Sequence, residues 1–211
     1  MNSVLKTIAG RLGRALLEGE ALERRFAALK AAAPAPVAPP IADTTACFVA
    51  EAEKNLFEIS RHSSLGTLIT YLANRHLPVV LAPQESLRSL DWQAAAGRLT
   101  EDYHTPALGV VEAVAGIAET GTVAIRSTDV PSGLLFLCEE LVIVLRQEHI
   151  LALQEELWQK LSPGGYRALH LISGPSRTAD VEQTLQVGAH GPRRVYLWLV
   201  TENGDPAPRV P

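Results

Sequence analysis

Apolar residues in this chain fall into short continuous runs that polar turns separate. Runs that are apolar throughout, such as LVIVL at 141–145, are typical of strands buried on both faces. The strands expected on this pattern lie at 46–51, 78–83, 108–118, 122–126, 141–145, 168–172 and 195–200. The two runs on either side of residues 119–121 predict a hairpin or tight corner there.

Helical spacing of apolar residues is clearest from Ser64 to His76, where positions 65, 68, 69 and 72 share one face. Further helices are expected at 86–90, 133–140 and 149–161. After the strand at 168–172, local pattern favours a turn and a capped helix, with Thr178 or Asp180 as N-cap and Gly188 near the C-cap. Strands that alternate with helices predict an α/β fold: a layered, mostly parallel sheet with helices on both faces.

The first 40 residues differ from the rest of the chain. Residues 1–30 form an amphipathic helical segment in which Leu5, Ile8, Leu12 and Leu16 make an apolar stripe that glycines interrupt. AAAPAPVAPP at 31–40 favours extended backbone and is typical of a linker. We expect an α/β domain over 41–211. The segment 1–30 either folds back on this domain or docks on a partner chain, and the pattern leaves both open.

Composition excludes several classes of protein. With 19 basic and 23 acidic residues, the net charge of −4 gives no basic footprint for nucleic acid or an anionic membrane. Cys47 and Cys138 have no CxxC spacing, so we expect no iron–sulfur cluster held by this chain alone. Each lies in an apolar stretch, which favours small buried residues over a disulfide. No leader-like or membrane-spanning apolar run is present, and we expect a cytoplasmic protein. Nucleotide-binding glycine motifs, the GxSxG elbow and HExxH are also missing.

Polar turns provide the candidate chemistry. A glutamate at the corner 119–121 could act as base or nucleophile, or simply accept backbone N–H groups. Small and hydroxyl residues after the strand at 168–172, followed by Arg177, could hold an anion, although Arg177 could instead pair with Asp180 or Glu182 on the surface. His190 could donate to a substrate oxygen or only to a backbone carbonyl, and a metal held by His190 with Asp180 is a weak alternative. The candidate ligand-binding residues are Thr120, Gly121, Thr122, Ser173, Gly174, Ser176, Arg177, Thr178, Asp180 and His190, with Glu119 as candidate catalytic carboxylate.

Two segments are informative through their exact residues as well as through their pattern of polar and apolar positions. ISGPSRTADVEQT at 172–184 with GAHGPR at 188–193, and GIAETGTVAIRS at 116–127, closely resemble the motifs of the lactate utilization protein C family, the LUD domain family. TIAGRLGRAL at 7–16 agrees with that family's N-terminal start, whereas Ala189 departs from the Val that many relatives have. The resemblance implies a fold like that of sugar-phosphate isomerases and coenzyme A transferases. It also implies a role in oxidising L-lactate to pyruvate beside iron–sulfur partner proteins.

Three functions fit these observations. The first is a non-redox component of an L-lactate-oxidising system that binds a small anionic metabolite or organises the complex, with no cofactor assigned to this chain and the iron–sulfur clusters on its partners. The second is a stand-alone transferase or isomerase that uses Glu119, by analogy with the glutamate of coenzyme A transferases. The third is a scaffold that binds partners through residues 1–30. The first two require the corner at 119–122 and the turn at 173–178 to meet at one small cleft.

Overall fold

A computed structural model describes residues 20, 21, 23, 24, 27, 41–102, 106–161, 166–179, 185–187 and 191–201. The chain divides into two compact units, Met1–Pro39 and Pro40–Pro211. The described residues of the first unit are helical and exposed, and they include an ion pair of 3.5 Å between Arg24 and Glu20. The apolar stripe at 5–16 and the expected linker at 31–40 lie outside the described residues, so the domain boundaries stay predictions.

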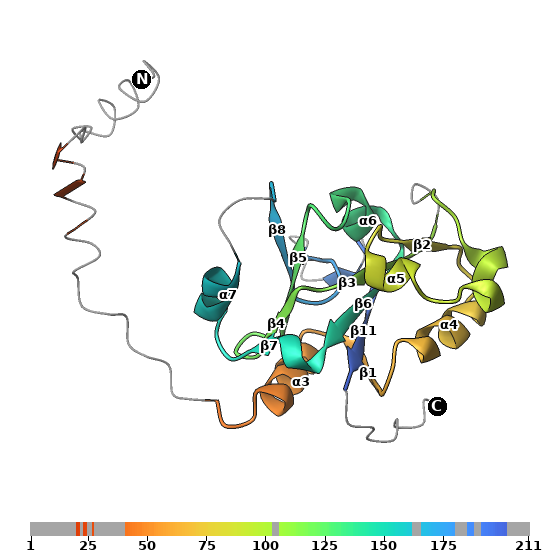
Figure 1. The fold of residues 1–211 in the computed structure, drawn as a ribbon, viewed down its shortest axis with the longest axis horizontal. Helices are drawn as coiled ribbons and strands as arrows, with labels where there is room; N and C mark the ends of the chain where they lie inside the picture. The colour runs from red at the N-terminus through yellow and green to blue at the C-terminus, as the bar shows by residue number, and fades with distance from the viewer. Residues whose placement is uncertain are drawn as a thin grey trace, which may run out of the picture. The chain divides into compact units, whose positions relative to one another are not determined.

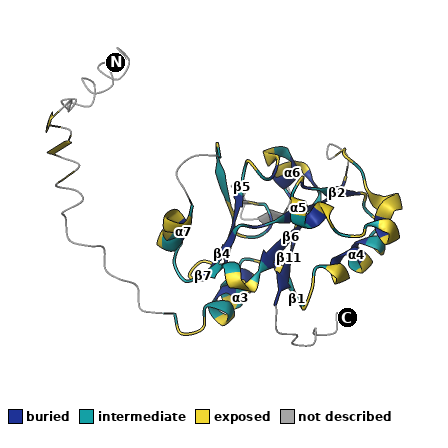
Figure 2. Ribbon diagram, in the orientation of Figure 1, coloured by how far each residue is buried: buried dark blue, intermediate teal, exposed yellow. Residues whose placement is uncertain are grey.

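The central sheet of the second unit is entirely parallel (Figure 1). Its strands are β1 (Glu58–His62), β2 (Val79–Leu81), β3 (Leu108–Glu112), β6 (Glu140–Arg146) and β11 (Arg194–Val200), in the order β1-β11-β6-β3-β2. The middle of β6 is buried throughout, from Leu141 to Leu145, and so is β11 from Val195 to Val200 (Figure 2). Continuous apolar runs therefore became strands covered on both faces, as predicted.

A second, smaller sheet stands beside the first. It has the order β7-β4-β5-β8, with β4 (Ala115–Ile117) and β5 (Thr122–Arg126) forming the antiparallel hairpin expected around residues 119–121. Its outer strands are β7 (Ile150–Leu151) and β8 (Leu169–Ile172). The apolar run 108–118 thus contributes one strand to each sheet, β3 and β4. A separate two-stranded ladder joins β9 (Arg177–Ala179) and β10 (Leu185–Val187).

Helices cover both faces of the central sheet. The helical elements of this unit are α3 (Thr44–Lys54), α4 (Gly66–Ala73), α5 (Glu85–Arg88), η1 (Gln93–Arg98), α6 (Ser132–Leu137), η2 (Gln147–His149) and α7 (Gln154–Lys160). On one face, Tyr71 of α4 packs against Tyr196 and Trp198 of β11, at ring distances of 6.1 and 5.2 Å. Side chains alternate between the two faces of a sheet, so the other face carries the intervening residues of each strand, such as Leu141 and Leu145 of β6. Contacts to this face come from α3, through Phe48, and α6, through Leu134.

The layered α/β architecture with a mostly parallel sheet is therefore confirmed. The expected helix at 64–76 corresponds to α4, the turn at 86–90 to α5 and the helix at 133–140 to α6. In the part of the chain that the structure describes, no helix combines the length and apolar character needed to cross a bilayer.

The first expected strand, 46–51, is wrong, because these residues belong to helix α3. The side chain of Asp43 caps this helix and accepts a hydrogen bond from the backbone N–H of Ala46, at 2.9 Å. Phe48 and Ala52, four residues apart, are fully buried on one face of it. An N-cap and a helical spacing of buried residues therefore outweigh the strand-like run ACFVAE.

Two helix predictions near the C-terminal half also need correction. Residues 178–188 were expected to be a capped helix, but Thr178 pairs with Gln186 in the ladder of β9 and β10, so cross-strand pairing outweighs the local cap signal. The expected helix at 149–161 begins only at Gln154. Before it, Ile150 and Leu151 pair with the edge of β4, which would otherwise leave its backbone groups unpaired.

Both cysteines are free thiols. Cys138 is buried, as expected, and burial raises the pKa of its thiol to about 11. Cys47 is only half-buried, and its Sγ donates to the carbonyl oxygen of Ala118 over 3.5 Å.

Candidate functional site

The corner at 119–122 closes the hairpin of β4 and β5 and rests on helix α3. Gly121 has φ +61°, and a Cβ there would lie 2.8 Å from Cα of Ala52, with the backbone atoms of residues 51 and 52 closer still. Only glycine fits such an approach. Glu119 at this corner is exposed, and its carboxylate accepts a hydrogen bond of 2.7 Å from the backbone N–H of Gln154, the first residue of α7.

The turn after β8 rests on the same helix. Gly174 has φ +93°, and a Cβ there would overlap the carbonyl oxygen of Asn55, the C-cap residue of α3. The side-chain amide of Asn55 also donates to the carbonyl oxygen of Thr120, at 2.7 Å. Asn55 therefore contacts both bends, through its backbone and its side chain.

A pair of hydroxyls joins the two bends directly. Oγ1 of Thr122 and Oγ of Ser173 are 2.7 Å apart, and Thr122 is buried, with 6% of its surface exposed. Hence the two residues that share this hydrogen bond are 51 positions apart in the chain. The bends meet, as the sequence predicted, although Glu119 turns its carboxylate toward α7.

The segment before β11 completes the second bend. The backbone N–H of Ser176 donates to the carbonyl oxygen of Pro192 at 3.0 Å, and a Cβ on Gly191 would lie 3.1 Å from Cβ of Ser176. Here the structure opens into a cavity of about 230 Å³, which we call the signature cavity. It is lined by Ser173, Gly174, Ser176, Gly191 and Pro192 together with the apolar residues Leu135, Phe136, Leu141, Leu171, Ile172 and Val195.

Comparison with known proteins places the chain in a family. The model of the LUD domain matches residues 48–200, most of the α/β unit. The chain belongs to the LUD domain family. This match includes both bends and the signature cavity.

Relatives of the chain agree with this family. Lactate utilization protein C of Geobacillus sp. strain WCH70 is 27% identical over 94% of this chain and 94% of its own length. YkgG of Escherichia coli K12, an uncharacterized protein, is 36% identical, but its match spans only 54% of this chain and 53% of that protein. The crystal structure of a DUF162 family protein from Deinococcus radiodurans is similar in fold, with a TM-score of 0.54 at 16% identity over 77% of this chain and 99% of that one. The likeness to sugar-phosphate isomerases and coenzyme A transferases stays a prediction.

Not every predicted residue of this LUD domain lies at the signature cavity. Ser173, Gly174 and Ser176 line it, and Thr122 joins it through Ser173. Arg177 begins β9 with an exposed side chain that forms no ion pair with another described residue. Thr178 is described only through its backbone pairing, and Asp180 and His190 lie outside the described residues.

The turn after β8 does not lie where open α/β sheets usually bind ligands. Open α/β sheets bind ligands at the carboxyl ends of their parallel strands, but β8 is a half-exposed antiparallel strand of the smaller sheet. Leu141 and Val195, which line the signature cavity, lie at the amino ends of β6 and β11. The signature cavity is therefore at the opposite edge of the central sheet from the usual crevice.

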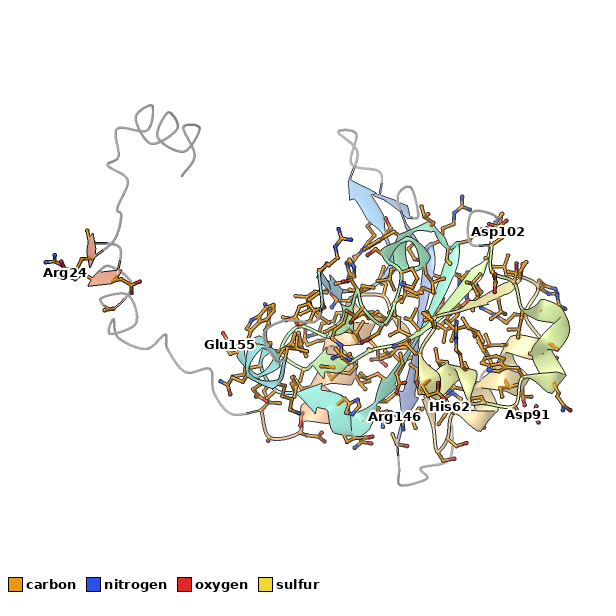
Figure 3. The ribbon with its side chains drawn as sticks, turned by 45° about the horizontal axis from the view of Figure 1, so that its top comes forward. Arg24, His62, Asp91, Asp102, Arg146 and Glu155 are labelled. Atoms are coloured by element: carbon orange, nitrogen blue, oxygen red, sulfur yellow. The ribbon has the colours of Figure 1, made fainter. Side chains whose placement is uncertain are left out.

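The carboxyl edge of the LUD domain has a charged cluster that sequence patterns missed. Glu112 ends β3, and its carboxylate accepts from Nε of Arg146 at 2.8 Å and from the hydroxyl of Ser86. The side chain of Gln84 forms two hydrogen bonds with the backbone of Glu112, at 2.6 and 2.8 Å. Figure 3 shows Arg146 at this end of the sheet. The sequence offered one signal for this cluster: Glu112 and Arg146 are each a charged residue directly after an apolar run.

An aromatic stack lies at the same edge. The ring of His62 packs on that of Trp198 with a centroid distance of 3.4 Å and an interplanar angle of 1°. Burial lowers the pKa of His62 below its ordinary value, because the imidazolium would lose hydration there. Its Nδ1 lies 3.3 Å from the hydroxyl of Thr67, whereas Nε2 is enclosed without a partner among the described residues. Burial at this position therefore favours a neutral histidine.

Proposed function

We propose that this chain is the non-redox component of a system that oxidises L-lactate to pyruvate and works with iron–sulfur partner proteins. In this proposal it binds a small anionic ligand at the signature cavity. Membership of the LUD domain family and the near full-length match to a lactate utilization protein C support the role. The observation that most supports the ligand site is the convergence of residues 173–176 and 191–192 on one cavity.

The cavity suits a short 2-hydroxy or 2-oxo acid. Its volume of about 230 Å³ exceeds what three carbons need, and apolar residues such as Leu135 and Ile172 can contact a methyl group. The hydroxyls of Ser173 and Ser176 can donate to a carboxylate or accept from an α-hydroxyl. Arg177 does not line the cavity, but it follows Ser176 directly, and its long exposed side chain can supply the positive charge. Thr178, Asp180 and His190 remain candidate contacts in the same proposal.

Electron flow explains why partners are needed. Conversion of L-lactate to pyruvate removes two electrons and two protons, so an acceptor must take them up. The chain has only two cysteines, whereas an iron–sulfur cluster requires four ligands, most often cysteine thiolates. In this proposal clusters on the partner proteins receive the electrons, and this chain supplies binding and orientation.

A stand-alone transferase reaction at Glu119 has less support. The carboxylate of Glu119 is already bonded to the N–H of Gln154 and points toward the start of α7. It is not among the residues that line the signature cavity. Full lactate oxidation by a Glu119→Gln variant would agree with a structural role for this group, whereas loss of turnover with folding intact would favour the enzyme hypothesis.

The proposed function is tested by reconstitution with the iron–sulfur partner proteins. Lactate-dependent reduction of a dye is measured for the wild-type chain, for Arg177→Gln and for Arg167→Gln as a matched control. Arg167 is also exposed, precedes β8 and lies outside the signature cavity. We expect Arg177→Gln to raise the lactate concentration needed for half-maximal rate about tenfold, because a charge-assisted bond is lost. Equal behaviour of the two variants would overturn the ligand site, and full activity without this chain would overturn the role.

A further inference from the structure

The carboxyl edge of the central sheet opens into a larger cavity, of about 620 Å³. It forms where the chain leaves neighbouring parallel strands in different directions. After β2 the chain continues into α5, whereas after β3 and β6 it crosses into the smaller sheet, through β4 and β7. Such a divergence beyond the carboxyl ends of parallel strands is where open α/β sheets bind ligands.

The two walls and the floor come from different parts of the chain. One wall is formed by residues 83–86 at the start of α5, and the floor by Glu112 and Ala113. The opposite wall is formed by Val114, Arg126, Thr128, Asp129, His149, Lys160 and Leu161. We call this space the carboxyl-edge cavity. Its volume is in the range of cavities that enclose whole metabolites and cofactors.

Neighbouring side chains hold the floor of the carboxyl-edge cavity in place and neutralise the charge of its carboxylate. Arg146 and Ser86 hold the carboxylate of Glu112, and 12% of the Glu112 side chain is exposed. On the far wall, Nε of Arg126 contacts the carboxylate of Asp129 at 2.7 Å. Because these pairs neutralise one another, they leave no strong net charge of their own. The Ser86 hydroxyl and the Glu112 carboxylate retain lone pairs that can accept from a ligand hydroxyl.

One charged group on the second wall lacks a partner among the described residues. Lys160 is exposed at the last turn of α7 and forms no ion pair there. The ring of His149 lines the same wall, but its Nδ1 has no exposed surface and so is not available to a ligand. A lysine ammonium at the side of a polar cavity matches an oxyanion.

We propose that the carboxyl-edge cavity binds a hydroxylated metabolite with an anionic head group. The oxyanion contacts Lys160, beside the ring of His149, and the ligand hydroxyls donate to Glu112 and Ser86. This site is separate from the signature cavity and does not depend on the function proposed above. A carboxylate and a phosphate share the required chemistry, so the probes differ in which of them they present.

The test is calorimetric titration of the full chain with L-lactate, inorganic phosphate and 6-phosphogluconate. The last has a phosphate, a carboxylate and hydroxyls at a size that suits 620 Å³. We expect it to bind most tightly and Lys160→Gln to weaken it about tenfold, the value of one charge-assisted contact. Lys54→Gln, an exposed lysine of α3, is the matched control and should bind as the wild type does. Arg177→Gln should also leave this binding unchanged.

A second measurement locates the ligand. The imidazole signals of His149 in nuclear magnetic resonance spectra should move on addition of 6-phosphogluconate, and Ser86→Ala should weaken binding while Ser89→Ala, on the same turn of chain, should not. Absence of binding by 6-phosphogluconate would overturn the proposal, whether or not L-lactate binds at the signature cavity. So would equal binding by Lys160→Gln and wild type, or signal changes confined to residues 173–177.

Discussion

Replacing Gly174 by alanine tests whether the second bend is held against helix α3. The backbone at Gly174 has φ +93°, a conformation that costs a residue with a side chain about 1–3 kcal/mol. In addition, the new Cβ would overlap the carbonyl oxygen of Asn55 and lie 3.0 Å from its carbonyl carbon. The neighbouring atoms are backbone, so they cannot move aside as the end of a flexible side chain would.

The two terms together give an expected loss of about 3–5 kcal/mol in the free energy of unfolding, which is large for one methyl group. In a domain of this size about 1 kcal/mol lowers the melting temperature by about 2–4 °C, so the fall should exceed 6 °C. Differential scanning calorimetry and urea unfolding measure it. Gly97→Ala is the matched control, because a Cβ there meets nothing within 4 Å.

The reasoning is refuted if Gly174→Ala and Gly97→Ala melt at the same temperature. It is also refuted if Asn55→Ala restores the stability of Gly174→Ala, because the overlap involves the backbone of Asn55, which the substitution keeps. By itself, Asn55→Ala should cost about 1 kcal/mol through the lost bond to Thr120.

Three further results are expected. Thr122→Val removes the buried hydroxyl that pairs with Ser173 and should lower the free energy of unfolding by about 1–3 kcal/mol in urea titrations; an unchanged midpoint would show that the pair contributes nothing. Leu56→Gly should raise that free energy by about 1 kcal/mol, since Leu56 follows α3 with φ +66° and is 51% exposed; a loss of stability would contradict this. For His62, the folded pKa lies below the unfolded value, so the unfolded chain binds more protons and stability falls as pH drops below about 6.5. Urea midpoints from pH 8 to 5 should show this loss, and His62→Gln should reduce it.

Sequence patterns predicted four of the five strands of the central sheet, because β2, β3, β6 and β11 lie in mainly apolar runs. They missed β1, whose residues are polar except for Ile59. β6 and β11 are apolar over nearly their whole length, which is typical of a strand covered on both faces, and the structure buries them in that way. Segments near 46–51 and 178–188 were mispredicted because they are short and their apolar residues fit two periods. There the outcome depends on Asp43 as a cap and on pairing between β9 and β10, which local pattern does not determine.

The candidate site was predicted in part for a similar reason. The polar bends were identifiable, and the meeting of Thr122 with Ser173 agrees with them. The direction of the Glu119 carboxylate depends on where α7 begins, and the prediction began that helix five residues too early. The cluster of Glu112, Arg146 and Ser86 was missed because its members come from three separate connections and share no spacing.

One short stretch of backbone, from Glu51 to Asn55, supports both bends at once. Gly121 approaches one part of it and Gly174 another, while the Asn55 amide holds Thr120. A small tilt or sliding of α3 would therefore shift both bends together and change the separation of the Thr122 and Ser173 hydroxyls. Because Ser173 and Gly174 line the signature cavity, a movement of α3 would change the shape of that cavity although α3 itself does not line it.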